Sequence, residues 1–260
     1  MIVAGALVLG SQLLAVYAAV QGMGLHRGEL GDLPPELTLL LILAGSAGSL
    51  VGMGVAVIWL RTASGVSWAD LGIGPQPWLQ NTWLGIVSFL LLMVPIFGLQ
   101  FTLNWLYEYF GEPPPQHPLI KHLMDFPTGA GFAIAAFVAV IVAPLTEEFL
   151  FRLVFQGWLE RVDRRWLRPS QPLYSEAHGG PEQLAPRARP LVLWPIFVSS
   201  AVFALMHFSH GVAWIPLFFF ALALGYLYQR TGSLVPSIVL HVCLNGTTML
   251  ILWLATMSGL

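Results

Sequence analysis

The sequence predicts an all-α fold, a multi-pass transmembrane helical bundle with about seven spanning helices, and three observations lead to it. Of the 260 residues, 57% are hydrophobic and only 9% are charged, against about 25% charged in an ordinary soluble domain. The mean hydropathy is +0.75. The apolar residues gather in long runs, each near the roughly 20 residues that a helix needs to cross a bilayer. This composition argues against a soluble globular fold and against disorder.

Seven apolar runs are expected to form these helices, with six to eight as the range that their boundaries permit. The breaks between them contain glycine and proline, which favour turns. We expect the first run to be a retained helix rather than a signal peptide, because it is long and lacks a basic leading segment. The runs cover residues 2–20, 37–60, 82–106, 129–155, 190–207, 212–228 and 234–257.

The long polar segment 156–189 sets the predicted orientation of the chain. It is rich in arginine, and loops rich in Lys and Arg face the cytoplasm. The loops around Arg61 and Arg230 then also lie inside. We therefore predict a cytoplasmic N-terminus and a C-terminus on the outer side.

Net charge and cysteine content limit the partners of the chain. The formal net charge is -2, with 11 basic and 13 acidic residues, so no basic surface is available for nucleic acid. Cys243 is the single cysteine, which excludes an intrachain disulfide and a zinc site built from cysteines. We predict no nucleic-acid partner, and the sequence leaves the oligomeric state open.

Three charged residues stand inside the fourth apolar run, where a charge at mid-bilayer costs about 2.5–3.5 kcal/mol. They are Glu147, Glu148 and Arg152. Glu148 and Arg152 are four residues apart, so they share a helix face and we expect an ion pair that holds the helix. Glu147 points about 100° away and has no such partner. It is either protonated and inert or directed into a polar cavity.

Polar residues also interrupt two later runs. His207 ends the fifth run, and His241 and Asn245 lie four apart on one face of the seventh. A single intramembrane histidine is often only a packing group. Three separate helices that each carry a catalytic type of residue favour a site, because each such residue costs free energy in the bilayer.

These residues contain the parts needed to hydrolyse an amide bond. Glu147, removed from bulk water, can take a proton from a water molecule with an imidazole assisting. A second imidazole and the Asn245 amide can stabilise the oxyanion. A metal site made of Glu147, His207 and His241 is a minor alternative. The chain contains neither the His-Glu-x-x-His motif of metalloproteases nor the Gly-x-Ser-x-Gly motif of serine hydrolases.

The spacing of these residues resembles the three motifs of the CAAX prenyl protease type II and bacteriocin-processing family, also called the abortive-infection family. The similarity extends over about residues 133–248 and matches every motif position. The motifs are Glu147-Glu148-x-x-x-Arg152, Phe203-x-x-x-His207 and His241-x-x-x-Asn245.

The resemblance implies an intramembrane glutamic endopeptidase. By analogy, Glu147 activates the water with the help of His207, and His241 and Asn245 stabilise the oxyanion. The implied substrate is a peptide or protein at the membrane, hydrophobic or lipid-modified, and membrane lipid is the other expected partner. A non-catalytic membrane scaffold or immunity-type protein is the alternative function. A transporter is a third, which the absence of an obvious internal repeat disfavours.

By the same resemblance, Glu148 and Arg152 mainly hold the helix, and neither a metal nor a cofactor is implied. Two regions are then expected. Residues 129–257 form the catalytic helical core, which includes the cytoplasmic loop 156–189. Residues 1–128 form N-terminal transmembrane helices to which the motifs assign no role.

Convergence of the four catalytic candidates places a condition on the fifth helix. In an ordinary spanning helix, His207 lies too near the outer surface to meet Glu147. The helix must therefore end at mid-depth, and the turn 208–211 must line a water-filled cavity, where irregular backbone is tolerated. We expect that cavity between the fourth, fifth and seventh helices, open to the cytoplasm.

Overall fold

The computed structural model describes residues 1–25, 33–72, 77–111, 129–167 and 191–258, and most of these residues lie in helices. No strand occurs among them. Six helices are long and apolar enough to cross a membrane, and a seventh apolar helix, Leu193–Met206, is shorter. The prediction of an all-α multi-pass bundle is confirmed.

The first three spans are single helices, the fourth is a chain of α- and π-helical segments, and the last three follow in quick succession. The fourth span, Ala130–Leu167, is 38 residues long and is called the central helix below. The elements are α1 (Ile2–Gly22), α2 (Pro35–Ala63), α3 (Trp78–Tyr109), α5 (Ala130–Phe137), η2 (Val138–Val142), α6 (Ala143–Glu148), η3 (Phe149–Gln156), α7 (Gly157–Val162), η4 (Asp163–Leu167), α8 (Leu193–Met206), η5 (Phe208–Ala213), α9 (Trp214–Thr231) and α10 (Val235–Ser258).

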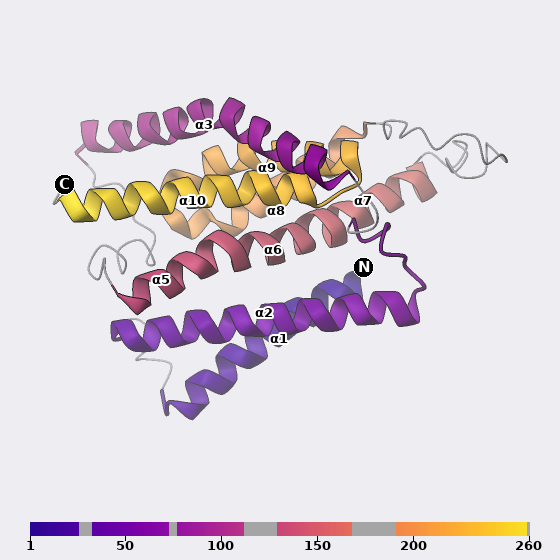
Figure 1. Cartoon of the computed structure of the whole chain (residues 1–260), viewed down its shortest axis with the longest axis horizontal. Helices are drawn as coiled ribbons and strands as arrows, with labels where there is room; N and C mark the ends of the chain where they lie inside the picture. Colours follow the sequence, from indigo (N-terminus) through magenta and orange to yellow (C-terminus); the bar gives the residue numbers. More distant parts are fainter. Residues whose placement is uncertain (26–32, 73–76, 112–128, 168–190, 259–260) are drawn as a thin grey trace.

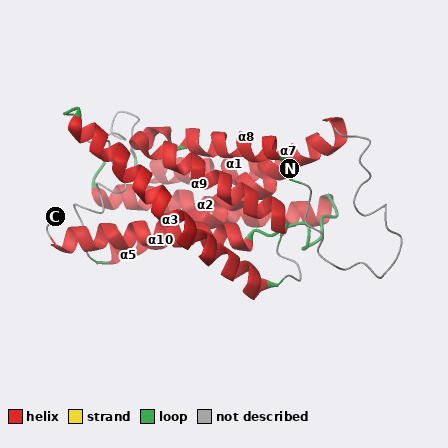
Figure 2. Cartoon of the chain, turned by 90° about the horizontal axis from the view of Figure 1, so that it is seen from above, coloured by secondary structure: helices red, strands yellow, loops and turns green. Residues whose placement is uncertain are grey.

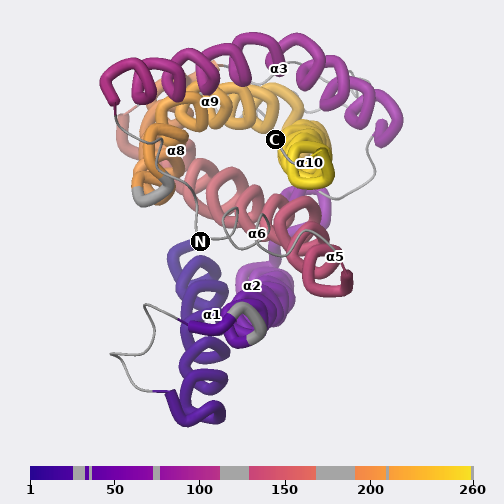
Figure 3. Tube along the Cα trace, turned by 90° about the vertical axis from the view of Figure 1, so that its left-hand side faces the viewer, coloured from indigo at the N-terminus to yellow at the C-terminus, as the bar shows by residue number. Residues whose placement is uncertain are grey.

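The central helix separates two groups of helices. The hairpin of α1 and α2 lies on one side of it, and α3, α8, α9 and α10 lie on the other (Figures 1 and 3). The N-terminus lies toward the end of the bundle where the central helix finishes, and the C-terminus lies at the opposite end (Figure 2). Opposite ends are what an odd number of crossings requires. Which end faces the cytoplasm stays a prediction.

Glycines bring the two helices of the N-terminal hairpin together. Gly48 and Gly52 of α2 are four residues apart, the small-residue spacing that lets membrane helices approach closely. A Cβ added at Gly48 would lie 2.6 Å from the carbonyl oxygen of Ser11, and one at Gly52 would lie 2.7 Å from that of Leu7. The α1 and α2 backbones are therefore in direct contact.

The N-terminal half of α1 joins this hairpin to the central helix. Ala4 and Val8 are fully buried in one apolar cluster with Leu153 and Val154 of η3. On the other side of the central helix, Phe151 of η3 is buried in a cluster with Phe203 of α8 and Ala221 of α9. The central helix is thus packed from two sides around η3.

The predicted boundary of the cytoplasmic loop at residue 156 is wrong, because the central helix continues to Leu167. Glu160 and Asp163 there are buried and hydrogen-bonded, whereas Arg161, Arg164 and Arg165 are exposed. The indole Nε1 of Trp194 donates to Asp163 Oδ1 at 2.7 Å, and Gln229 Nε2 donates to Glu160 Oε1 at 3.0 Å. Residues 168–190 of the predicted loop lie outside the described residues.

Candidate active site

Glu147 and Glu148 of the central helix lie at the end of α6, between two π-helical segments. π-Helical turns are rare and often occur at functional sites. The hydroxyl of Thr146 donates to the carbonyl of Val142 at 3.0 Å, so its polar group is satisfied inside the helix. The side chains of Glu147 and Glu148, the next two residues, lie in different environments.

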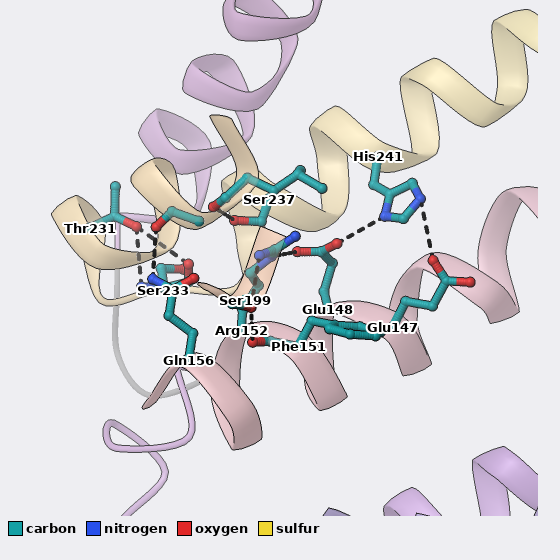
Figure 4. A network of polar contacts seen from close by, with 12 residues as sticks. Glu147, Glu148, Phe151, Arg152, Gln156, Ser199, Thr231, Ser233, Ser237 and His241 are labelled. Atoms are coloured by element: carbon teal, nitrogen blue, oxygen red, sulfur yellow. Dashed lines mark hydrogen bonds and ion pairs between the residues drawn. The ribbon is translucent and has the colours of Figure 1, made fainter. Parts of the chain in front are cut away.

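Glu148 is completely buried and joins two other motif residues (Figure 4). Arg152 Nε donates to Glu148 Oε2 at 3.2 Å, the ion pair expected from the spacing. Glu148 Oε1 lies 2.9 Å from His241 Nδ1. Arg152 also donates to the Ser199 hydroxyl at 3.3 Å, and that hydroxyl donates to the Phe151 carbonyl at 3.0 Å. Glu148 therefore holds His241 as well as the helix.

The contact with Glu148 sets the orientation of the His241 ring. A carboxylate paired with Arg152 accepts hydrogen bonds, so the proton of this contact belongs to Nδ1. The ring lies edge-on to Phe203 and Phe220, with centroids 6.0 and 5.3 Å away. Nε2 then faces Glu147 Oε2 at 3.7 Å, which is longer than a direct hydrogen bond.

Glu147 differs from its neighbour because its side chain is 28% exposed. It lines a cavity of about 590 Å³ together with His207, and the two groups are close enough to interact electrostatically. Of the two alternatives for Glu147, the structure has the one in which it reaches a cavity.

His207 comes to this depth because α8 is short. The helix has 14 residues and ends at Met206, so it extends about 21 Å, less than the roughly 30 Å of the hydrocarbon core. The chain continues as the 3₁₀ helix Phe208–Ala213. The His207 ring packs on Phe203 at 4.7 Å, and its Nδ1 lies 2.8 Å from the Phe203 carbonyl oxygen. The early end of the fifth helix agrees with the condition set by the sequence.

The walls of the cavity differ from the prediction. It lies between the central helix, the end of α8 and the N-terminal hairpin, whereas α10 contributes no lining residue. The physical reason is that Glu148 and the two phenylalanine rings keep His241 buried at 3% exposure. The hairpin takes the place that the seventh helix was expected to fill.

Asn245 lies one turn beyond His241 on α10 and contacts a different part of the central helix. Its Nδ2 donates to the carbonyl oxygen of Ala139, in η2, at 2.8 Å. One of its two amide N–H groups is thus engaged away from Glu147. The four catalytic candidates divide into Glu147 and His207 at the cavity, and His241 and Asn245 beside it.

Two features of the site escaped the sequence. Ser199 follows no motif, and nothing in its spacing connects it to Arg152, which is 47 positions away. The hairpin residues at the cavity carry no charge. The polar residue Gln12 within an apolar run is the sequence feature that points to a role for the hairpin. Among the described residues, no three His, Cys, Asp or Glu side chains gather in the way metal ligands do.

Residues 129–247 match the family model described as type II CAAX prenyl endopeptidase Rce1-like. This segment belongs to that family. The resemblance predicted from the motifs is confirmed, and the Rce1-like segment contains all seven motif residues, Glu147, Glu148, Arg152, Phe203, His207, His241 and Asn245. No curated protein and no solved structure matches the chain significantly. The chain is therefore an integral multi-pass membrane protein that contains a segment of a protease family, and α1, α2 and α3 lie outside the matched segment.

Proposed function

We propose that the chain is a glutamic intramembrane endopeptidase that hydrolyses a peptide bond in a membrane-associated peptide. The observation that carries this proposal is the difference between two adjacent carboxylates. Glu148 is bound on both oxygens by Arg152 and His241, whereas Glu147 reaches the cavity that it shares with His207. A carboxylate and an imidazole at one cavity are suited to activate water.

In the proposed reaction, Glu147 accepts a proton from a water molecule as the water oxygen attacks the peptide carbonyl carbon. The carbonyl π bond breaks and its electron pair stays on oxygen as an oxyanion. When the carbonyl re-forms, the C–N bond breaks and the proton held by Glu147 passes to the departing nitrogen. His207 hydrogen-bonds the water and assists this transfer, so the products are a carboxylic acid and an amine.

His241 and Asn245 are proposed to stabilise the oxyanion. With Nδ1–H donated to Glu148, an Nε2–H donor requires the imidazolium form, and Glu147 and Glu148 lie at its two ring nitrogens. Nε2 already points toward Glu147. Asn245 contributes the N–H that is not given to Ala139. Each such donor contributes about 2.7–4 kcal/mol where it has been measured.

The test is substrate trapping with Glu147→Gln in native membranes, followed by identification of the retained peptides and a cleavage assay on them. We expect the variant to fold normally and to lose at least about 10³-fold in cleavage, within the range for general-base removal. Glu108→Gln, which alters an exposed carboxylate at the end of α3, is the control.

Normal cleavage by Glu147→Gln would contradict the proposal. Complementation of a deletion strain by this variant would favour the non-catalytic scaffold instead.

A further inference from the structure

The N-terminal hairpin forms one wall of the cavity that contains Glu147 and His207, although it lies outside the Rce1-like segment. Its contribution from α1 is Leu9, Gln12 and Val16. From α2 the cavity is lined by Thr38, Leu41, Ile42, Gly45, Ser46 and Ser49. The wall is mostly apolar and has no charged side chain.

Two polar side chains on this wall make no hydrogen bond within the described part of the protein. Ser49 donates to the Gly45 carbonyl at 3.0 Å, and Thr38 donates to the Pro34 carbonyl at 3.2 Å. In contrast, the Gln12 amide and the Ser46 hydroxyl have no hydrogen bond to any described residue. Both side chains border the cavity.

Gln12 lies at the middle of α1, Ile2–Gly22, where the surrounding lipid offers no hydrogen bond. Its amide borders the same cavity as Glu147 and His207, so its partners are water or a molecule that enters the cavity. A molecule with both a donor and an acceptor can replace that water at both groups of the amide.

Space for such a partner depends on Gly45. A Cβ at Gly45 would lie 3.2 Å from Val16 Cγ2 and 3.9 Å from Gln12 Nε2. A longer side chain would therefore crowd Val16 and Gln12. The cavity volume of about 590 Å³ is within the range of about 300–1,000 Å³ typical of ligand sites.

The chemistry of the wall selects the kind of occupant. A hydrocarbon chain has no group to pair with the Gln12 amide, and a charged side chain meets no opposite charge on the hairpin. An extended peptide main chain presents both N–H and C=O groups, and a glutamine amide can pair with both. The apolar residues of the wall then contact apolar side chains.

We propose that Gln12 and Ser46 bind the main chain of an uncharged, apolar peptide segment and present its peptide bond to Glu147. They are positioning residues, and the hairpin determines which peptides are accepted. The inference rests on the proposed function only for the fate of the bound peptide, because the binding itself requires no catalysis.

Binding is therefore measured in the Glu147→Gln background, in nanodiscs, with a fluorescent dodecapeptide of Leu, Ala, Val and Ser as the probe. We expect Gln12→Leu and Ser46→Ala each to weaken binding about fivefold and the double variant about 20-fold, as expected for lost hydrogen bonds. Ser46→Thr keeps the hydroxyl and should retain binding. The controls are Gln21→Leu and Ser11→Ala, on α1 but outside the cavity lining.

Three results would overturn the inference. The first is that the double variant and the controls bind the probe equally well, and the second is that a probe with Asp or Lys at its centre binds as well as the apolar one. The third is that only a prenylated probe binds and that the double variant binds it as tightly as the parent does. Thermal unfolding of each variant in nanodiscs identifies any loss of folding. A separate assay follows cleavage of the same peptide by the unsubstituted protein. Binding as expected without cleavage would contradict the proposed function and leave the inference standing.

Discussion

Charged and polar residues lie in different environments on the two faces of the central helix. Toward α8, α9 and α10, the side chains of Glu148, Arg152 and Gln156 are fully buried and each is hydrogen-bonded. Toward the N-terminal hairpin, Glu147 borders a cavity with only a 3.7 Å approach to His241. This difference is the basis of our proposal that, of two adjacent charges in a membrane helix, Glu148 serves stability on one face and Glu147 serves chemistry on the other.

The buried face extends well beyond the motif residues. Gln156 donates to Glu160 at 3.0 Å and to the Gly225 carbonyl at 3.0 Å. Gln229 accepts from the backbone N–H of Val192 at 2.7 Å. This network joins the central helix to α9 and to the residue before α8, and it thereby helps to fix the short helix that carries His207.

The largest effect on stability is expected from Arg152→Met. Removing the guanidinium leaves the Glu148 carboxylate buried without its cation, and breaking one side of a buried pair costs about 3–5 kcal/mol. Unfolding in detergent, followed by denaturant titration, measures the loss. Arg61→Met, which removes an exposed guanidinium 4.7 Å from the Trp68 ring, should change stability by less than about 1 kcal/mol. Equal effects of the two variants would contradict the division of faces.

A smaller loss is expected from Gly48→Leu, which forces α1 and α2 apart. Overpacking of this kind costs about 1–3 kcal/mol, and displacement of the hairpin also changes the cavity wall. Gly54→Leu is the matched control, because a Cβ there has no atom within 4 Å. The free energy of unfolding and the rate of peptide cleavage are measured for both variants. If Gly54→Leu lowers both quantities as much as Gly48→Leu does, the close contact of α1 with α2 is not the cause.

The smallest effect distinguishes two neighbouring serines of α8 that are both fully buried. Ser199→Ala removes the hydroxyl between Arg152 and the Phe151 carbonyl and should destabilise by about 1 kcal/mol. The Ser200 hydroxyl has no partner in the described structure, so Ser200→Ala should be neutral or slightly stabilising. The same unfolding titration compares the two, and the reverse order would show that the network around Arg152 is assigned wrongly.

Hydropathy was sufficient to predict the helices, because each apolar run is long enough to stand apart from its flanking turns. The motif residues were found for a related reason, since charges such as Glu147 and Arg152 are conspicuous in an apolar run. Even the early end of α8 followed from the need to bring His207 to the depth of Glu147. What the sequence reveals is therefore residue type and depth along each helix.

Lateral packing was much harder to predict. The contact between Glu148 and His241 joins residues 93 positions apart, and no periodicity specifies which helices become neighbours. The hairpin was left without a role because its cavity residues are uncharged. The helical residues up to Leu167 were read as loop because the sequence does not show that Glu160 and Asp163 are buried and hydrogen-bonded to residues of other elements.

The central claim is that Glu147 is the reactive carboxylate and Glu148 the structural one. The most direct test compares Glu147→Gln with Glu148→Gln, measuring cleavage of a trapped peptide and the free energy of unfolding of both proteins under the same conditions. We expect Glu147→Gln to lose cleavage with stability within about 1 kcal/mol of the parent, and Glu148→Gln to lose about 3–5 kcal/mol of stability as its partners Arg152 and His241 are left unbalanced. Retained cleavage in Glu147→Gln, or unchanged stability in Glu148→Gln, would contradict the account.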